Sequence, residues 1–369
     1  MTQVVNYGLV LLSLLKQKSK QRLLFLGLLT SFSVAGEPVV FGHIDAPSSL
    51  RIYSSFDLVI FAPLLERFVQ RNPELNILYE DINTAELYDR VIREKADPIA
   101  SIVVSSAMDL QIKLVNDGLA QTHISSYTEA LPNSEKWRNQ IFSFSLEPVV
   151  MVINNMLFPD AALPQDRSQL LQSIRRSGDV FNGKIGTYDI RRSGAGYLFA
   201  SQDARQADTT WGRLLEAFGS HQVKTYCCTS DIIHDLLAGD LIVGYNLVGA
   251  YAYEQVSNNP QLTMIMPSDY TLLLRRTALI PKNAPNPANA RRFLDFLLSD
   301  EGQNALRNPA LLSPFAFDKS KQTIIDETNH PIRLIELDQQ LLVGRDLAKY
   351  TRFINIWEEA LELLPDTAE

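Results

Sequence analysis

In the first third of the chain, the pattern of hydrophobic and polar residues alternates between segments typical of strands and segments typical of helices. Short apolar runs are each followed by a polar turn and then by apolar positions at helical spacing. Strands are expected at residues 50–53, 76–80 and 101–104, and helices at 58–71, 84–95 and 107–117. This βαβαβ pattern with short loops predicts a mostly parallel sheet, whose ligand site lies beyond the carboxyl ends of the strands.

Small hydroxyl residues follow two of these strands. Ser54 and Ser55 come after the first strand, and Ser105 and Ser106 after the third. Serine is a good helix N-cap, so each position has a purely structural explanation. Because the carboxyl ends of parallel strands meet at one edge of a sheet, the same hydroxyls are also candidates for binding a ligand.

A further strand, turn and helix lie at residues 185–204. The strand at residues 185–188 is followed by a polar turn with Arg191 and Arg192, and the helix opens with Ser193 and Gly194. Unpaired N–H groups and the positive end of a helix attract anions, and two arginines stand beside them. The pattern favours an anion site, and its alternative is a surface turn with solvated arginines.

Residues 1–36 have the features of a signal peptide. Four basic residues between positions 16 and 22, with no acidic residue, precede the apolar run 23–29 and the small-x-small sequence Ser33-Val34-Ala35. The apolar run is too short for a permanent span, which needs about 20 residues. The sequence therefore predicts export to the periplasm, with no cysteine after the cleavage site to accept a lipid.

Length and charge limit the classes of partner. Removal of the leader leaves 333 residues, enough for two domains, and changes the formal net charge from −8 to −12. Such acidity argues against nucleic acid or an anionic membrane as the partner. An anion site in this chain must be local.

Several sequence runs together resemble the extracellular solute-binding proteins of ABC importers, over residues 50 to about 315. The runs are IYSS at 52–55, SIVVSSAMDLQIKLVNDGLA at 101–120, FNGKIGTYDIRRSGAGYLF at 181–199 and ALIPKNAPNPANARRFLDFLLSDEGQ at 278–303. The last is characteristic of the branch with ferric-ion-binding and sugar-phosphate or phosphoglycerate-binding members. The resemblance implies an α/β type 2 periplasmic binding fold.

That fold implies two lobes joined by two crossing strands that act as a hinge. The crossings are expected near residues 144–153 and 262–277, which assigns residues 37–147 and 274–369 to the first lobe and 148–273 to the second. Residues 331–364 carry a long amphipathic helix expected to pack on the first lobe, with a docking surface for a membrane partner as the alternative. We expect a monomer.

Comparison with ferric-binding relatives argues against iron. The resemblance places Asp57, Ser106 and Ala250 where those relatives have a histidine, a glutamate and a tyrosine, and only Tyr251 keeps its type. Hard Fe³⁺ needs several anionic oxygens. The five histidines are scattered without a ligand-like spacing, so no metal and no cofactor is expected.

The remaining candidates form a polar set with positive character, suited to a small phosphorylated or carboxylated metabolite. Tyr245 is added as a cleft wall and Asn246 as an amide. The expected ligand-binding residues are Ser54, Ser55, Ser105, Ser106, Arg191, Arg192, Ser193, Gly194, Thr229, Ser230, Tyr245 and Asn246.

The two cysteines, Cys227 and Cys228, are adjacent. In an oxidising compartment they form either a vicinal disulfide or two buried thiols. Enzyme signatures such as GxSxG, GxxxxGK and HExxH are absent from the sequence. We therefore expect no enzyme. The preferred function is delivery of an anionic solute to an ABC permease in the inner membrane; the alternatives are signalling to a membrane sensor kinase, ferric-ion binding and an exported hydrolase.

Overall fold

The computed structural model describes residues 37–306, 310–311, 313 and 330–362. The expected signal peptide, with its cleavage site, lies outside the described residues. Among those described, no helix is long and apolar enough to cross a membrane.

The predicted βαβαβ unit is confirmed and forms one side of the first lobe. Strands β2 (Ser48–Ser54), β3 (Leu75–Asp81) and β4 (Ile102–Ser105) are parallel, with β2 in the middle. Helices α1 (Leu58–Arg71), α2 (Thr84–Arg93) and α3 (Met108–Asn116) connect and cover them. Strand β1 (Val39–Phe41) adds antiparallel to β3. All three parallel strands therefore end at the same edge.

The second lobe repeats this arrangement with different segments. Strands β7 (Ile185–Tyr188), β8 (Lys224–Tyr226) and β9 (Val243–Val248) are parallel, with β7 in the middle. They are accompanied by α5 (Arg167–Ser177), α6 (Gly194–Ser220), α7 (Thr229–Ala238) and α8 (Gly249–Asn258). Helix α6 begins at Gly194, as the turn sequence predicts. Helices α6, α7 and α8 each follow the carboxyl end of a strand. In α6 a short turn separates the strand from the helix.

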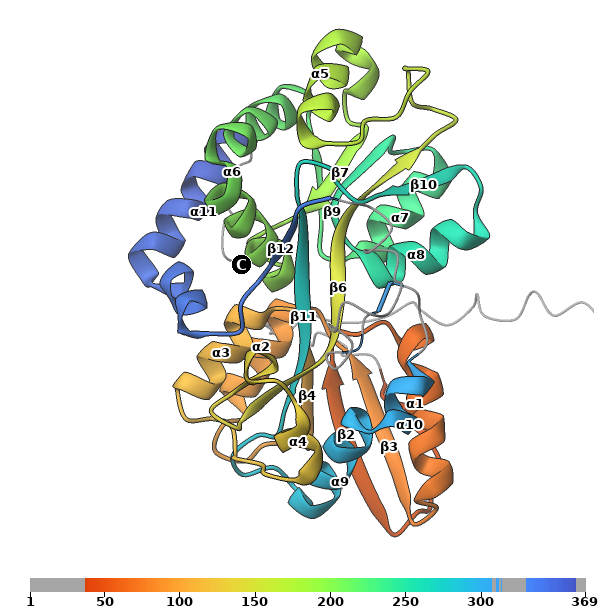
Figure 1. Cartoon of the computed structure of the whole chain (residues 1–369), viewed down its shortest axis with the longest axis vertical. Coiled ribbons are helices and arrows are strands. Elements are labelled where there is room, and N and C mark those ends of the chain that lie inside the picture. The colour runs from red at the N-terminus through yellow and green to blue at the C-terminus, as the bar shows by residue number, and fades with distance from the viewer. Residues whose placement is uncertain (1–36, 307–309, 312, 314–329, 363–369) are drawn as a thin grey trace, which may run out of the picture. The chain divides into compact units, whose positions relative to one another are not determined.

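Two long strands connect the lobes (Figure 1). Strand β6 (Ile141–Asn154) pairs antiparallel with β11 (Thr271–Leu279), and also with β9 and with β10 (Leu262–Ile265). The strand order is β1-β3-β2-β4-β11-β6-β9-β7-β8. The first crossing lies where the sequence placed it, whereas the second begins only at Thr271, because residues 262–265 form the separate strand β10. Because β6 and β11 contribute to both lobes, the division at residues 147 and 273 stays a prediction.

The remaining elements complete the described chain. They are α4 (Ser126–Ala130), η1 (Asn133–Glu135), β5 (Lys136–Trp137), η2 (Gly178–Phe181), α9 (Pro287–Leu298), α10 (Asp300–Ala305), β12 (Ile332–Leu334), η3 (Gln339–Arg345) and α11 (Leu347–Leu361). Helix α9 covers the first lobe, where Phe68 and Phe293 meet edge to face with ring centroids 5.1 Å apart. The first-lobe core therefore joins segments from both ends of the chain.

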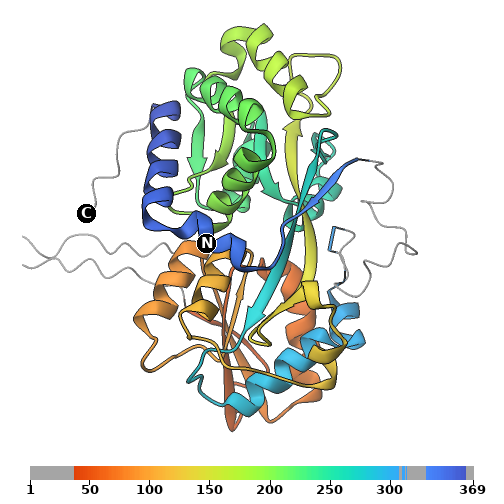
Figure 2. The same cartoon turned by 60° about the vertical axis from the view of Figure 1, so that its left-hand side comes forward.

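The C-terminal helix packs on the second lobe, which corrects the expectation of first-lobe packing. In α11, Trp357 and Leu361 are buried against the second-lobe core, and Phe353 stacks on Trp211 of α6 at 5.0 Å. Figure 2 shows α11 beside α6. The helix is also shorter than predicted, because Asp346 caps it by accepting a hydrogen bond from the backbone N–H of Lys349. The preceding η3 reaches the first lobe, through Arg345 and Asp109 at 2.6 Å.

Candidate functional site

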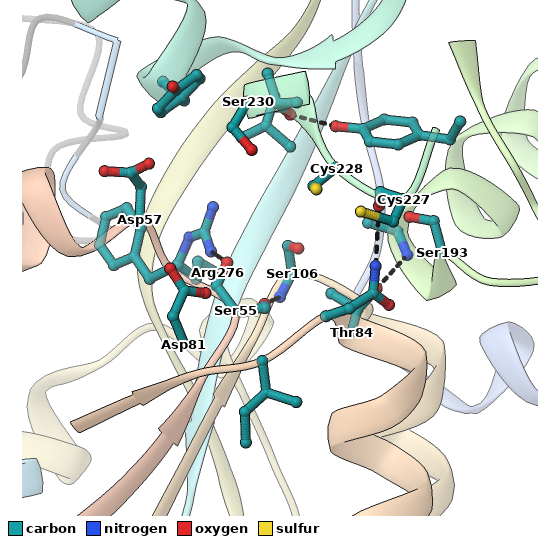
Figure 3. Close-up of a pocket in the computed structure, with 18 of the residues that line it drawn as sticks. Ser55, Asp57, Asp81, Thr84, Ser106, Ser193, Cys227, Cys228, Ser230 and Arg276 are labelled. Carbon is teal, nitrogen blue, oxygen red and sulfur yellow. Dashed lines mark hydrogen bonds between the residues drawn. The ribbon is translucent and has the colours of Figure 1, made fainter. Parts of the chain in front are cut away.

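A pocket of about 320 Å³ opens between the two lobes at the carboxyl ends of their strands (Figure 3). Its first-lobe wall comes from the turns after β2, β3 and β4, and its second-lobe wall from the starts of α6, α7 and α8. The lining residues are Ser55, Phe56, Asp57, Ile60, Asp81, Ile82, Asn83, Thr84, Ser106, Tyr188, Ser193, Ala195, Cys227, Cys228, Thr229, Ser230, Val248, Tyr251 and Arg276.

Two carboxylates face the first-lobe side of the pocket. Asp57 is the N-cap of α1, accepting from the Val59 N–H at 2.9 Å, and Asp81 ends β3. Burial raises the pKa of both carboxyls, and repulsion from Asp57 helps to raise the pKa of Asp81 to about 6. At pH 7 most Asp81 carboxyls are still ionised and accept hydrogen bonds.

One arginine, Arg276 of β11, lines the pocket. Its guanidinium makes a bidentate pair with Glu147 of β6 at 2.6 and 3.2 Å and donates to the Ser55 carbonyl at 3.0 Å. It also lies 4.0 Å over the ring of Phe56. Because Glu147 is fully buried beside it, the positive charge of Arg276 is already neutralised. The positive character expected from the sequence is therefore absent from the described side chains of the lining.

Helix N-termini supply the positive end of the pocket instead. Helix α7 begins without a side-chain cap, whereas Ser193 caps α6 by accepting from the Gly196 N–H. Thr229, the first residue of α7, shares a hydrogen bond of 2.5 Å with the Tyr188 hydroxyl. Each N-terminus carries roughly half a positive charge. The second-lobe wall thus offers backbone N–H groups and hydroxyls to an anionic group.

The two walls touch at one edge of the pocket. The Asn83 side chain donates to the Cys227 carbonyl at 2.9 Å, and the Ala195 N–H donates to the Thr84 hydroxyl at 3.1 Å. Gly194 allows this approach, since a Cβ there would lie 2.6 Å from the Leu110 side chain of α3. Each contact joins a first-lobe element to a second-lobe element.

Five of the residues predicted from the sequence line the pocket: Ser55, Ser106, Ser193, Thr229 and Ser230.

Three more predicted residues lie directly behind the lining. The Ser54 hydroxyl accepts from the Phe56 N–H, and the Ser105 hydroxyl from the Ala107 N–H. These two serines stabilise the turns after β2 and β4, and Gly194 packs between the lobes.

The other four predicted residues are not among those lining the pocket. Arg191 pairs with Asp189 and Glu358, at 2.6 and 3.3 Å, and Arg192 is exposed. Tyr245 and Asn246 each donate to the buried carboxylate of Asp203, at 2.8 and 2.7 Å. They belong to an internal network of the second lobe, in which Arg167 donates to the Tyr245 hydroxyl.

The sequence analysis missed Arg276, Asp81, Asn83 and Thr84 as lining residues. A signal for Arg276 was present, because Arg275 and Arg276 interrupt the otherwise apolar strand 271–279. A charge inside a buried strand needs a partner, so such a pair marks a special position. The polar run after β3 was read only as the start of a helix.

The structure gives Cys227 and Cys228 as two free thiols, both half-buried at the pocket edge.

Comparison with known proteins identifies the class. A family described as bacterial extracellular solute-binding protein matches residues 54–308. A substrate-binding protein of an ABC transporter from Agrobacterium tumefaciens is 34% identical, and the match covers 88% of this chain and 98% of that one, with a TM-score of 0.82. No curated protein sequence matches. The chain belongs to the bacterial extracellular solute-binding family of ABC transporters, whose members act outside the cytoplasm with a membrane permease.

Two more distant structures confirm the type 2 periplasmic binding fold. AfuA from Actinobacillus pleuropneumoniae, solved with fructose-6-phosphate, is 18% identical over 86% of this chain and 99% of its own, with a TM-score of 0.69. Iron-bound HitA from Pseudomonas aeruginosa is 15% identical over 85% of this chain and 99% of its own, with a TM-score of 0.65. At this identity they establish the fold alone.

Proposed function

We propose that this solute-binding protein captures a small metabolite that carries both an anionic group and hydroxyl groups, and delivers it to an ABC permease. The anionic group is a phosphate or a carboxylate. The observation that supports this is the two-sided pocket: the start of α7, which has no side-chain cap, on one wall, and the carboxylates of Asp57 and Asp81 on the other.

The two walls suit different parts of one molecule. Backbone N–H groups and hydroxyls bind an anion without adding a full charge. Carboxylates accept strong hydrogen bonds from hydroxyl groups. A bare phosphate would leave Asp57 and Asp81 facing it without a donor. A sugar phosphate or a phosphoglycerate satisfies both walls.

A thermal-shift panel tests the proposal. Sugar phosphates, phosphoglycerates, hydroxylated carboxylates, the neutral parent sugars and polyamines are compared at equal concentration. A ligand at 100 times its Kd stabilises by about 2.7 kcal/mol, which gives a clear shift. The proposal predicts shifts among the hydroxylated anions. Shifts confined to neutral sugars or to polyamines would contradict it.

Variants locate the binding to this pocket. Asp57→Asn and Asp81→Asn should weaken the hydroxyl contacts of the best anion, by up to the 1.5–3 kcal/mol typical of charged hydrogen bonds. Arg192→Ala is the matched control, because this arginine is exposed and outside the lining. Loss of affinity in Arg192→Ala alone would move the site away from the pocket.

We also propose that ferric iron is not the solute. Asp57, Ser106 and Tyr251 do line the pocket, but burial raises the pKa of Tyr251 and so disfavours the phenolate that Fe³⁺ needs. The protein mixed with ferric citrate should stay colourless. A stable visible band that disappears in Tyr251→Phe would make iron the solute.

A further inference from the structure

The two cysteines and one aspartate converge at the pocket edge. Cys227 precedes α7, Cys228 is its N-cap, and Asp231 lies in its first turn. Both thiols donate to the same carboxylate oxygen, Asp231 Oδ2, at 3.3 Å from Cys227 Sγ and 3.1 Å from Cys228 Sγ. Adjacent side chains on an extended chain normally point apart, so this convergence is a specific feature of the turn into α7.

The spacing of the three atoms matches metal coordination. The two sulfurs and a carboxylate oxygen all lie within 4.8 Å of one another. In a tetrahedral zinc site with bonds of 2.3 Å, two sulfurs lie about 3.8 Å apart. A metal at the centre would replace the two S–H···O hydrogen bonds.

Two thiolates and the Asp231 carboxylate would carry three negative charges, which outweigh the roughly half positive charge of the α7 start and favour a bound cation. The start of a helix stabilises a thiolate. Asp57 and Asp81 line the same pocket, and its arginine is already paired with Glu147. The half-buried position of both thiols keeps them reachable from the pocket.

We propose that Cys227, Cys228 and Asp231 form a binding site for a thiophilic divalent cation of the Zn²⁺ class. The two sulfurs and the carboxylate supply three ligands, and the fourth position is left to water or to a pocket molecule. On binding, each thiol releases its proton to water, so the site changes from neutral thiols to thiolates. The sequence-based expectation of no metal considered only histidines and oxygen ligands.

Cadmium titration of the purified, reduced protein tests the site with a spectroscopic readout. Cd²⁺ bound by thiolates absorbs in the ultraviolet through charge transfer, and Zn²⁺, which is silent, should displace it. We expect one Cd²⁺ per chain, with release of the two thiol protons measured in weak buffer. Absence of the band, or a band that Zn²⁺ does not remove, would overturn the proposal.

Three variants and one control assign the ligands. Cys227→Ser and Cys228→Ser should each abolish tight binding, and Asp231→Asn should weaken it at least about tenfold, the lower end of what loss of an outer-shell partner costs. His234→Gln is the control, because this exposed histidine lies on the same helix but outside the three-atom cluster. Unchanged binding in Cys228→Ser, or loss in His234→Gln, would refute the assignment.

Mass spectrometry tests whether Cys227 and Cys228 form a disulfide instead of a metal site. Protein purified without reductant should carry both thiols or the bound metal. A mass lower by two hydrogens, located to the peptide with Cys227 and Cys228, would show a vicinal disulfide and overturn the metal site. This result is independent of the thermal-shift panel, since no solute is added in it.

Discussion

Glu147 and Arg276 form a buried ion pair beneath the pocket, and its two members depend on each other. Their side chains are almost fully buried, and the guanidinium has both of its pairing nitrogens on the carboxylate. Removing one partner of such a pair leaves an uncompensated buried charge. The pair therefore makes a strong prediction about stability.

We expect Glu147→Ala to lower the free energy of unfolding by about 3–5 kcal/mol. Urea unfolding followed by circular dichroism measures it. Glu74→Ala is the control, since its pair with Arg292 lies on the surface, and it should change little. Equal effects of the two substitutions would show that burial of the ion pair does not matter.

Asp81 makes a pH-dependent prediction. Its pKa of about 6 in the folded state exceeds the unfolded value near 3.9, so the ionised form costs stability above pH 6. Asp81→Asn should stabilise the unliganded protein at pH 7, by no more than about 1 kcal/mol because solvent reaches this side chain. This gain in stability should shrink as the pH falls from 6 to 4, and it should vanish below pH 4.

Melting temperatures of both proteins across that range test this, with Asp208→Asn as the matched control on an exposed part of α6. A gain that does not depend on pH would contradict the assigned cause.

At the residue scale, the sequence predicted the hydroxyls of the site better than its charges. Ser55 and Ser106 follow their strands directly, so local pattern places them at the pocket. The state of Arg276 depends on Glu147, which is 129 residues away in the sequence. Whether an arginine is free or neutralised is set by such a distant partner, and local pattern carries no information about it.

At the scale of elements, the packing of α11 on the second lobe, which the sequence did not predict, can be tested. Trp357→Ala should cost about 3–5 kcal/mol, because the indole is buried against the second-lobe core. Ile356→Ala is the neighbouring control, as Ile356 is 43% exposed. Unfolding in urea compares them. Near-equal costs would mean that α11 does not pack on α6 in solution.

The elements themselves were largely predictable, and their partners were less so. Apolar spacing placed α1, α2 and α3, because each buries one face on a nearby sheet. The polar turn before Gly194 placed the start of α6. The same spacing in α11 showed that one face is buried without showing which surface covers it. That choice depends on the matching rings of Trp211 and Phe353, which are distant in sequence.

At the scale of the whole molecule, Gly194 lies where the lobes meet, and its missing Cβ lets α6 approach α3 closely. Gly194→Ala places a Cβ 2.6 Å from the Leu110 side chain, so either that side chain moves or the lobes separate. We expect a larger radius of gyration and weaker binding of the best solute. Small-angle X-ray scattering with and without that solute measures both states.

Gly212→Ala is the matched control in the same helix, where an added Cβ meets nothing within 4 Å. It should leave scattering and affinity unchanged and slightly stabilise α6. If both variants keep the radius of gyration of the unchanged protein, with and without solute, then the Gly194 contact does not control closure.

The interleaving of the two lobes along the chain has a consequence for the order of folding. Strands β2, β3 and β4 lie near the beginning of the chain, yet their neighbour β11 and the Phe68 partner Phe293 are synthesised much later. The aromatic core of the first lobe is therefore incomplete until α9 has been made. Pairings of such high contact order form slowly. During synthesis, β2, β3 and β4 therefore wait for β11 and α9 to complete their packing. In contrast, β7, β8 and β9 lie in one contiguous segment and can pair with one another earlier.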